Sequence, residues 1–200
     1  MSWFKLLADR MRGRPTDPAA IARAAKVREF KAAVARGLDG DRATLDALLE
    51  MPATLGLPDD EVELEVEAVQ GALDLLALRD AVARDGLPVV EHQHKALSTE
   101  RCHFLASAFL ANDGGDRTGR LFLTHRRLVF VSSPMIALSW SGIATINQNA
   151  RDLIVVPVAK ETLYQFRCNS FSDARRGAFI AQQLKRGNNG TGAGVPPDPR

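Results

Sequence analysis

The spacing of apolar residues changes near residue 86 of the chain. Before that point, apolar residues recur every three or four positions, which is the spacing of amphipathic helices. Between about 87 and 168 they come in short runs separated by turn residues, which is typical of antiparallel strands. The segment 171–186 returns to helical spacing. These patterns predict an α+β protein in which helices precede an antiparallel sheet and one helix follows it.

Helix boundary signals divide the first half into separate helices. Asp17 can cap a helix that Gly37 ends, and Pro58 suits the first turn of a long helix that closes at Gly86. The stretch "EVELEVE" alternates like a strand, but the spacing after it favours a helix. The predicted helices are a segment before Gly13, then 18–37, about 41–49 with its end disturbed by Pro52 and Gly56, and 58–86 with an inner face of Val62, Val66, Val69, Leu73 and Leu76.

Turn residues separate seven short apolar runs in the second half, and a helix closes it. Ser170 or Ser172 can cap that helix, because either hydroxyl can accept from its first amides. Strands are predicted near 101–110, 119–124, 127–133, 136–140, 143–147, 152–158 and 162–168, and the inner face of the closing helix comprises Phe171, Ala174, Ala178, Phe179 and Leu184.

Charge is segregated along the chain, although the formal net charge is only +2. Residues 1–36 carry a net charge of +6, residues 37–91 carry −11, and residues 92–200 carry +7. A dedicated nucleic-acid-binding protein would not usually set so acidic a segment beside its basic face. We therefore expect no nucleic-acid partner.

Composition predicts a cytoplasmic protein with reduced cysteines. No run approaches the roughly 18–20 uninterrupted apolar residues that a membrane span needs. The N-terminal stretch mixes charged with apolar residues, whereas a secretory signal has a clean apolar run. Cys102 and Cys168 lie far apart and lack CxxC spacing, so we expect neither a disulfide nor a metal site from them.

Four stretches of the second half resemble one family of domains. "GRLFLTHRRLVFV", residues 119–131, resembles the G-x-L-x-L-T-x-x-R-L-V-F signature of the GRAM and bacterial pleckstrin-homology-like (PH-like) families. "IALSWSGIATI" follows where those families place a strand, a short turn and an Ile-rich strand. "ALSTERCHF" resembles the lead into their first strand, and "SDARRGAFIAQQL" resembles their terminal helix. The resemblance covers about residues 95–186, and no family is evident for the helical N-terminal half.

The resemblance implies a seven-stranded antiparallel PH-like barrel capped by a C-terminal helix. Such a domain would span 93–187, after a helical region at 1–92 and before a Gly/Pro/Asn-rich tail at 188–200 that we expect to be disordered. It also implies a non-catalytic adaptor without a cofactor. The adaptor would dock a protein partner or, more weakly, an anionic membrane surface at the inner face of the membrane. PH-like barrels serve many partners, so the fold does not choose among them.

A basic turn joins the two strands of the signature. Arg127 opens the return strand, where its stem can lie along the barrel while its guanidinium stays in water, so a structural role is expected for it. The candidate ligand-binding residues are Arg117 and Arg120 from the first hairpin and His125, Arg126 and Arg127 from this turn; Asp113 and Asp116 of the first loop oppose them in charge.

The N-terminal stretch "SWFKLLADRMRGR" allows two interpretations. As a basic amphipathic helix with aromatic residues at one end, it could lie in a membrane interface through Trp3, Phe4 and Lys5. It could equally be the first helix of a bundle, because aromatic residues at helical spacing more often pack into a core. Both interpretations stay open on the sequence.

An enzyme is the rival hypothesis to an adaptor. His92, His94, Cys102 and His103 form the only metal-like cluster, because an H-x-H pair can present two imidazoles on one side of a strand. No further ligand of conventional spacing accompanies them, and neither a P-loop nor a G-x-S-x-G motif is present. A small metal- or thiol-dependent enzyme is therefore the alternative, while the expectation is a protein without catalytic activity.

Overall fold

A computed structural model describes residues 17–97, 99–111, 117–159 and 163–190. The chain divides into two compact units, the first ending at Val69 and the second beginning at Gln70. This division falls inside one long helix, whereas the predicted domain boundaries, at 92/93 and 187/188, stay a prediction. None of the described helices combines the length and apolar character that crossing a bilayer requires.

The first unit is helical, and Asp17 caps its first described helix as predicted, while Asp41 caps the next. The Asp17 carboxylate accepts from the Ala19 amide at 3.0 Å, which satisfies a donor at the helix start. The Asp41 carboxylate accepts from the Thr44 hydroxyl at 2.6 Å and the Thr44 amide at 2.9 Å, and these bonds lower the pKa of Asp41. The elements are α2 (Pro18–Gly37), α3 (Arg42–Leu55), the 3-10 turn η1 (Asp59–Glu61) and the first part of α4 (Glu63–Asp85).

The predictions for the two prolines were wrong. Pro52 is buried inside α3, and the helix runs on to Leu55. It ends at Gly56, whose φ of 65° is the left-handed conformation that glycine adopts at little cost. Pro58 precedes η1 and does not open the long helix, which begins only at Glu63. Burial of Pro52 and the glycine cap outweigh the one hydrogen bond that proline cannot make.

The inner face predicted for the long helix changes along its length. Val62 and Val69 are buried as expected, but Leu73 and Leu76 are only half-buried. In the second unit, Gly71 closely approaches the backbone of Ser172. This part of α4 therefore packs on the C-terminal helix, and its buried residues in the second unit are Ala72, Leu75 and Leu78.

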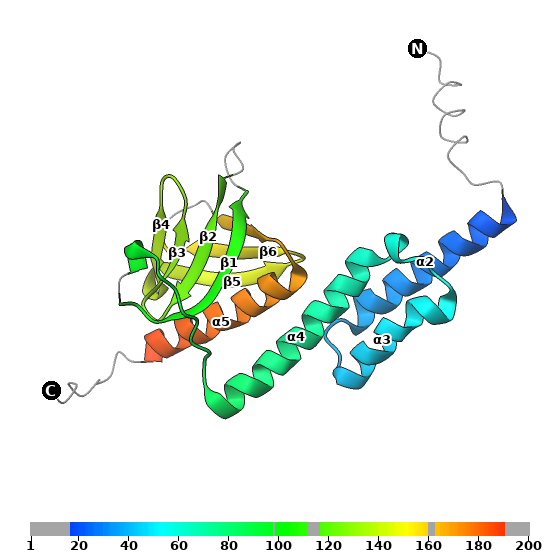
Figure 1. Ribbon diagram of the computed structural model, residues 1–200, viewed down its shortest axis with the longest axis horizontal. Coiled ribbons are helices and arrows are strands. Elements are labelled where there is room, and N and C mark those ends of the chain that lie inside the picture. The colour runs from blue at the N-terminus through cyan, green and yellow to red at the C-terminus, as the bar shows by residue number, and fades with distance from the viewer. Residues whose placement is uncertain (1–16, 98, 112–116, 160–162, 191–200) are drawn as a thin grey trace, which may run out of the picture. The chain divides into compact units, whose positions relative to one another are not determined.

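The second unit contains a seven-stranded antiparallel sheet in the order β4-β3-β2-β1-β7-β6-β5. Figure 1 shows β1 to β4 as one layer and β5 and β6 as a second layer that crosses it, with the C-terminal helix along one end. All seven predicted strands form, which confirms the α+β fold with a PH-like barrel. The strands are β1 (Cys102–Leu110), β2 (Arg117–Thr124), β3 (Arg127–Val131), β4 (Ile136–Ser139), β5 (Ile143–Asn149), β6 (Asp152–Pro157) and β7 (Tyr164–Cys168).

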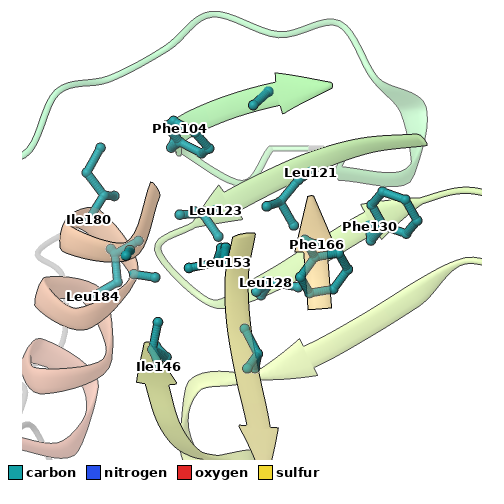
Figure 2. Packing of buried hydrophobic residues seen from close by; sticks show 14 of the residues in the cluster. Phe104, Leu121, Leu123, Leu128, Phe130, Ile146, Leu153, Phe166, Ile180 and Leu184 are labelled. Carbon is teal, nitrogen blue, oxygen red and sulfur yellow. The ribbon is translucent and has the colours of Figure 1, made fainter. Parts of the chain in front are cut away.

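The closing helix α5 (Phe171–Gly190) covers one end of the barrel. Ser170 caps it, since its hydroxyl accepts from the Asp173 amide at 3.0 Å. Figure 2 shows Ile180 and Leu184 of α5 turned toward the apolar side chains inside the barrel. The helix passes its predicted end at 186, so the first three residues of the predicted disordered tail are helical, and 191–200 lie outside the described residues.

The inner face predicted for α5 was partly wrong. Ala174, Ala178 and Leu184 are buried as expected, together with Ile180. Phe179 is only half-buried, because it lies at the margin of the core, where the Arg79 guanidinium is 5.8 Å from the centre of its ring. Phe171 is likewise half-buried, under the Arg151 guanidinium.

Candidate binding groove

Residues 88–97 and 99–101 form a strap across the outer face of β1 to β3. We call residues 88–94 the arm of the strap and residues 95–97 with 99–101 its anchor. The arm pairs once with the sheet, through a bridge between Val90 and Cys102. Leu97 of the anchor is fully buried, in a small apolar cluster with Cys102, Phe122 and Val129. Apolar residues of this stretch therefore pack on the sheet.

A cavity of about 810 Å³ lies between the strap and strands β1 and β2. Apolar surface is available in it from the exposed Val89 and the half-buried Val90 and Leu105. The Arg101 and Arg120 side chains are exposed beside that surface and have no acidic partner among the described residues. We call this cavity the groove; it is lined by Val89, Val90, Glu91, His92, Gln93, His94, Thr99, Glu100, Arg101, Cys102, Leu105, Arg120 and Phe122.

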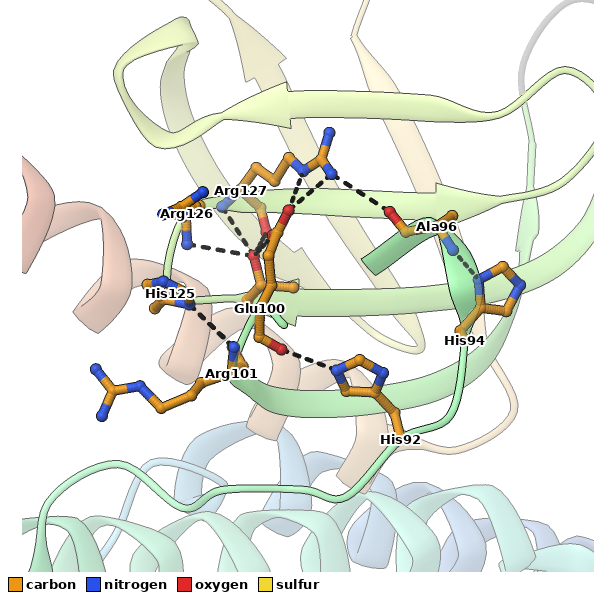
Figure 3. Close-up of polar contacts among 9 residues, drawn as sticks. His92, His94, Ala96, Glu100, Arg101, His125, Arg126 and Arg127 are labelled. Carbon is orange, nitrogen blue, oxygen red and sulfur yellow. Dashed lines mark hydrogen bonds and ion pairs between the residues drawn. The ribbon is translucent and has the colours of Figure 1, made fainter. Parts of the chain in front are cut away.

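Glu100 fastens the anchor to the sheet (Figure 3). Its carboxylate accepts from Arg127 Nε at 3.0 Å and from the Thr124 hydroxyl at 2.7 Å, and Arg127 Nη2 lies 2.7 Å from the same carboxylate. Burial raises the pKa of Glu100, but the bonds from Arg127 and Thr124 outweigh it, so the net shift is downward. Arg127 therefore joins the strap to the barrel, which is a structural role as expected. Its guanidinium does not simply stay in water, as the sequence predicted, because it pairs with Glu100 of the anchor.

Two histidines of the arm lie over the ring of Phe122. The ring centroids are 6.1 Å apart for His92 and 5.6 Å apart for His94. His92 Nε2 donates to the Glu100 carbonyl oxygen at 2.8 Å, and His94 Nδ1 accepts from the Ala96 amide at 3.3 Å. These contacts hold the arm against β2 and form one wall of the groove.

The predicted basic residues lie in different places. Arg120 lines the groove, while Arg117 lies at the start of β2, at the opposite end of the strand from the basic turn. In the turn, Arg126 is exposed, Arg127 is paired with Glu100, and His125 Nδ1 accepts from the Arg101 amide at 3.1 Å. The five residues therefore do not form one cluster. Their role in binding a ligand stays a prediction.

Several predicted features fall outside the described residues. Trp3, Phe4 and Lys5, the candidates for membrane contact, are among them. The same holds for Asp113 and Asp116 of the first hairpin loop. The choice between a membrane-bound and a packed N-terminal segment therefore stays open.

The cluster proposed for a metal or thiol enzyme does not converge. In the described part of the chain, no group of three His, Cys, Asp or Glu side chains is placed to hold a metal ion. His103 Nδ1 donates to the Pro88 carbonyl at 2.7 Å, and the Cys102 thiol donates to the Phe104 carbonyl at 3.0 Å. Burial raises the pKa of Cys102, and burial followed by nearby carboxylates raises the pKa of Cys168 to about 12, so both thiols stay protonated and unreactive.

Sequence reasoning missed most of the groove. Val89, Leu105 and Phe122 looked like ordinary strand or linker residues, and Arg101 was read as the start of a strand. The available signal was the pair Val89 and Val90 in a segment otherwise rich in polar residues. Two adjacent apolar residues near a sheet often pack on that sheet. This pair lies on the sheet.

The end of the barrel away from the basic turn carries a second notable surface. Strand pairing places the β3–β4 and β6–β7 loops at the same end as the start of β2. Large apolar side chains are exposed there: Met135 by 47%, Val158 by 65% and Leu163 by 42%. Arg117 lies at the start of β2, beside these loops. These exposed apolar residues and Arg117 therefore share one end of the barrel.

Comparisons with known proteins give only distant likenesses. No family model and no curated protein matches the chain. The DH/PH domain of human ARHGEF11, solved in a ternary complex with human RhoA and its inhibitor, is 13% identical over 80% of this chain and 54% of that chain, with a TM-score of 0.41. The linker-DH/PH domains of p115-RhoGEF are 15% identical over 75% of this chain and 53% of that chain, with a TM-score of 0.40.

The C-terminal domain of an unknown protein from Leishmania infantum is 12% identical over 56% of this chain and 97% of that chain, with a TM-score of 0.35. The chain spans about half the length of the two DH/PH structures. The PH-like fold rests on the strand order and the closing helix. TM-scores this low add nothing to that evidence. Membership of the GRAM family stays a prediction.

Proposed function

We propose that this protein is a non-catalytic binding module that docks a segment of a protein partner in the groove. The observation that carries the proposal is a cavity that combines apolar surface with two exposed guanidinium groups, which have no acidic partner among the described residues. Small clefts that combine apolar surface with a few well-placed polar groups are typical binding sites. The neutral, buried thiols and the dispersed histidines support a role without catalysis.

The composition of the groove indicates the chemistry of the segment. Val89, Val90 and Leu105 suit an aliphatic or aromatic side chain. Arg101 and Arg120 suit carboxylates, because a guanidinium can bind a carboxylate through two parallel hydrogen bonds. Glu91, also on the lining, would repel a segment with acidic residues along its whole length. We therefore propose a short segment with one or two acidic residues next to an apolar one.

Selection of peptides on the intact chain tests this proposal. A phage-displayed random peptide library is selected at pH 7.5, and an enriched peptide is titrated by fluorescence anisotropy. We expect enriched peptides to join an acidic to an apolar residue. Arg120→Glu should weaken their binding about tenfold or more, because it replaces an attraction by a repulsion, and 1.4 kcal/mol corresponds to a factor of ten.

The matched control is Arg176→Glu, a charge reversal at an exposed position of α5. It should leave the peptide affinity unchanged. If Arg126→Glu abolished binding while Arg120→Glu did not, the basic turn and not the groove would be the site. Failure to enrich any peptide above the background of an unrelated protein would count against the whole proposal.

The exposed apolar loops favour a second candidate function, weak docking on an anionic membrane. Met135, Val158 and Leu163 could enter the interface while Arg117 faces anionic headgroups. Each basic residue near an anionic surface contributes about 1 kcal/mol, and the attraction fades within a Debye length. Among the described residues at this end, Arg117 with a few exposed apolar side chains supports only weak, salt-sensitive binding.

Vesicle flotation tests this second function. Vesicles of phosphatidylcholine with phosphatidylserine are mixed with the full chain at low and at high salt. We expect weak flotation at low salt that is lost at high salt, and its loss in Met135→Ser/Val158→Ser. Flotation that persists at high salt would reverse the ranking of the two functions. Equal flotation of the wild type and the serine variant would remove these loops from the site.

A further inference from the structure

We propose that the arm of the strap, residues 88–94, is a proton-sensitive gate of the groove. The arm closes on the sheet when its histidines are neutral and is released in mild acid. This inference rests on the proposed function in one respect, because it takes the groove as the binding site. The opening and closing of the arm depend on the contacts of the strap alone.

All four histidines of the 200-residue chain contact the strap. His92 and His94 belong to the arm. His103 on β1 donates from Nδ1 to the Pro88 carbonyl at the start of the arm, at 2.7 Å. His125 in the basic turn accepts from the Arg101 amide at the end of the anchor. Titratable imidazoles are thus confined to the contacts of one segment.

Each arm histidine makes a contact that suits the neutral ring. His92 Nε2 carries the hydrogen, because its partner is a carbonyl oxygen, which can only accept. His92 Nδ1 is buried and has no hydrogen-bond partner among the described residues, so a proton there would be buried without an acceptor. His94 Nδ1 accepts from the Ala96 amide, and a proton on that nitrogen would face another donor.

His103 adds a third ring that resists protonation. Its side chain is buried, and burial lowers the pKa of His103. The bond to the Pro88 carbonyl opposes that shift, while the positive charges of Arg101 and His125 add to it. Burial of His103 therefore favours its neutral ring, whereas the contact from the arm, the Pro88 carbonyl, opposes that effect. The sign of the gate accordingly rests on the contacts of His92 and His94.

Charged groups of both signs surround the arm. The acidic groups are Glu91 on the arm and Glu100 on the anchor, and the latter is paired with Arg127 of β3. The other charged or titratable groups on the described elements around the arm include Lys95 and Arg101 on the anchor, Cys102 on β1, Arg117 and Arg120 on β2, and His125 and Arg126 in the basic turn.

The anchor of the strap does not depend on imidazoles in the same way. Leu97 is fully buried, and Glu100 binds Arg127 and Thr124. The pKa of Glu100 is lowered from 4.5, so its carboxylate stays ionised through the range in which histidines titrate. The His125 amide also donates to the Arg101 carbonyl at 3.0 Å, and protonation of the ring leaves that backbone bond intact. Mild acid should therefore release the arm and leave the anchor in place.

Release of the arm removes one wall of the groove, since Val89 to His94 are among its lining residues. A segment bound between the arm and β1–β2 would lose its contacts with that wall. The affinity of the groove for a peptide is therefore expected to fall as the pH falls from 7.5 to 5.0.

Hydrogen exchange of the intact chain, resolved by residue with NMR and corrected for intrinsic rates, tests the gate at pH 7.5 and 5.0. Between pH 7.5 and 5.0, the protection of amides in the arm should fall. The fall should be up to about 30-fold for each histidine that binds a proton only when the arm is open, if a free imidazole has a pKa of about 6.5. The amides of Leu97 and of the barrel strands should keep their protection. Equal protection of the arm at both pH values, or joint loss in arm and barrel, would overturn the gate.

The variant His92→Gln/His94→Gln removes two of the titrating rings while keeping hydrogen-bonding side chains. If its arm is protected at pH 7.5, the dependence on pH should shrink by about tenfold or more. If the arm of the variant is not protected at pH 7.5, NMR titration of the histidine ring protons in the wild type tests the gate instead. The pH at which the arm amides lose half of their protection must then equal the titration midpoint of an arm histidine. Different midpoints would contradict the gate.

Peptide binding separates the two proposals. An enriched peptide that binds at pH 7.5, together with an arm that stays closed at pH 5.0, would preserve the groove and overturn the gate. An arm that opens in acid while peptide affinity stays constant would preserve the gate and overturn the groove as the binding site.

Discussion

Deletion of α5 by a stop codon after Asn169 is expected to leave a chain whose barrel is insoluble or molten. Ile180 and Leu184 alone contribute about 3–6 kcal/mol through burial, at about 1.5–3 kcal/mol for each fully buried large aliphatic side chain. That is a large share of the 5–15 kcal/mol that stabilises a typical domain. The deletion also exposes the barrel core at the end that α5 covers.

Near-UV circular dichroism and size-exclusion chromatography measure this outcome, because Trp140 is buried in the barrel and loses its fixed environment when the core loosens. The control is a chain that ends after Gly190, which keeps α5 whole and should show the wild-type spectrum. A monomeric fragment that lacks α5 but unfolds cooperatively would show that the helix is not part of the barrel's folding unit, contrary to the PH-like fold.

Gly119→Ala is expected to destabilise the barrel by about 3 kcal/mol. A β-carbon at Gly119 would lie 2.5 Å from the Val131 carbonyl oxygen and 2.7 Å from the Phe130 ring. The oxygen belongs to the neighbouring strand β3, so relief requires the β2–β3 pair to separate locally. Overpacking of a well-packed core typically costs about 1–3 kcal/mol, and contact with backbone places this site at the upper end.

Urea unfolding monitored by far-UV circular dichroism measures the loss. Gly187→Ala is the matched control, since Gly187 is exposed near the end of α5 and an added β-carbon meets nothing within 4 Å. That substitution should be neutral or stabilising by up to about 1 kcal/mol, because alanine favours a helix over glycine. Equal midpoints for Gly119→Ala and the wild type would contradict the close approach of β2 and β3.

Local pattern was sufficient for most of the fold. The strands are short apolar runs and turn residues bound each run, so their number and positions follow from near neighbours. Helix caps such as Asp17 and Ser170 act within three residues of their partners. Pro52 is the instructive failure, because burial in the tertiary structure outweighed a strong local signal.

The sequence by itself determined the order of helices and strands and the barrel, because these depend on periodicity and on a motif read within a few residues. Only the tertiary structure decided that residues 88–97 and 99–101 form a strap and that Arg127 fastens it. The contacts that hold it join residues far apart in sequence: Glu100 binds Arg127, 27 positions on, and Arg101 binds His125, 24 positions on. No local pattern encodes such pairs, because the sheet has to form before the two partners meet. The groove exists for the same reason, since one wall comes from the strap and the other from β1 and β2.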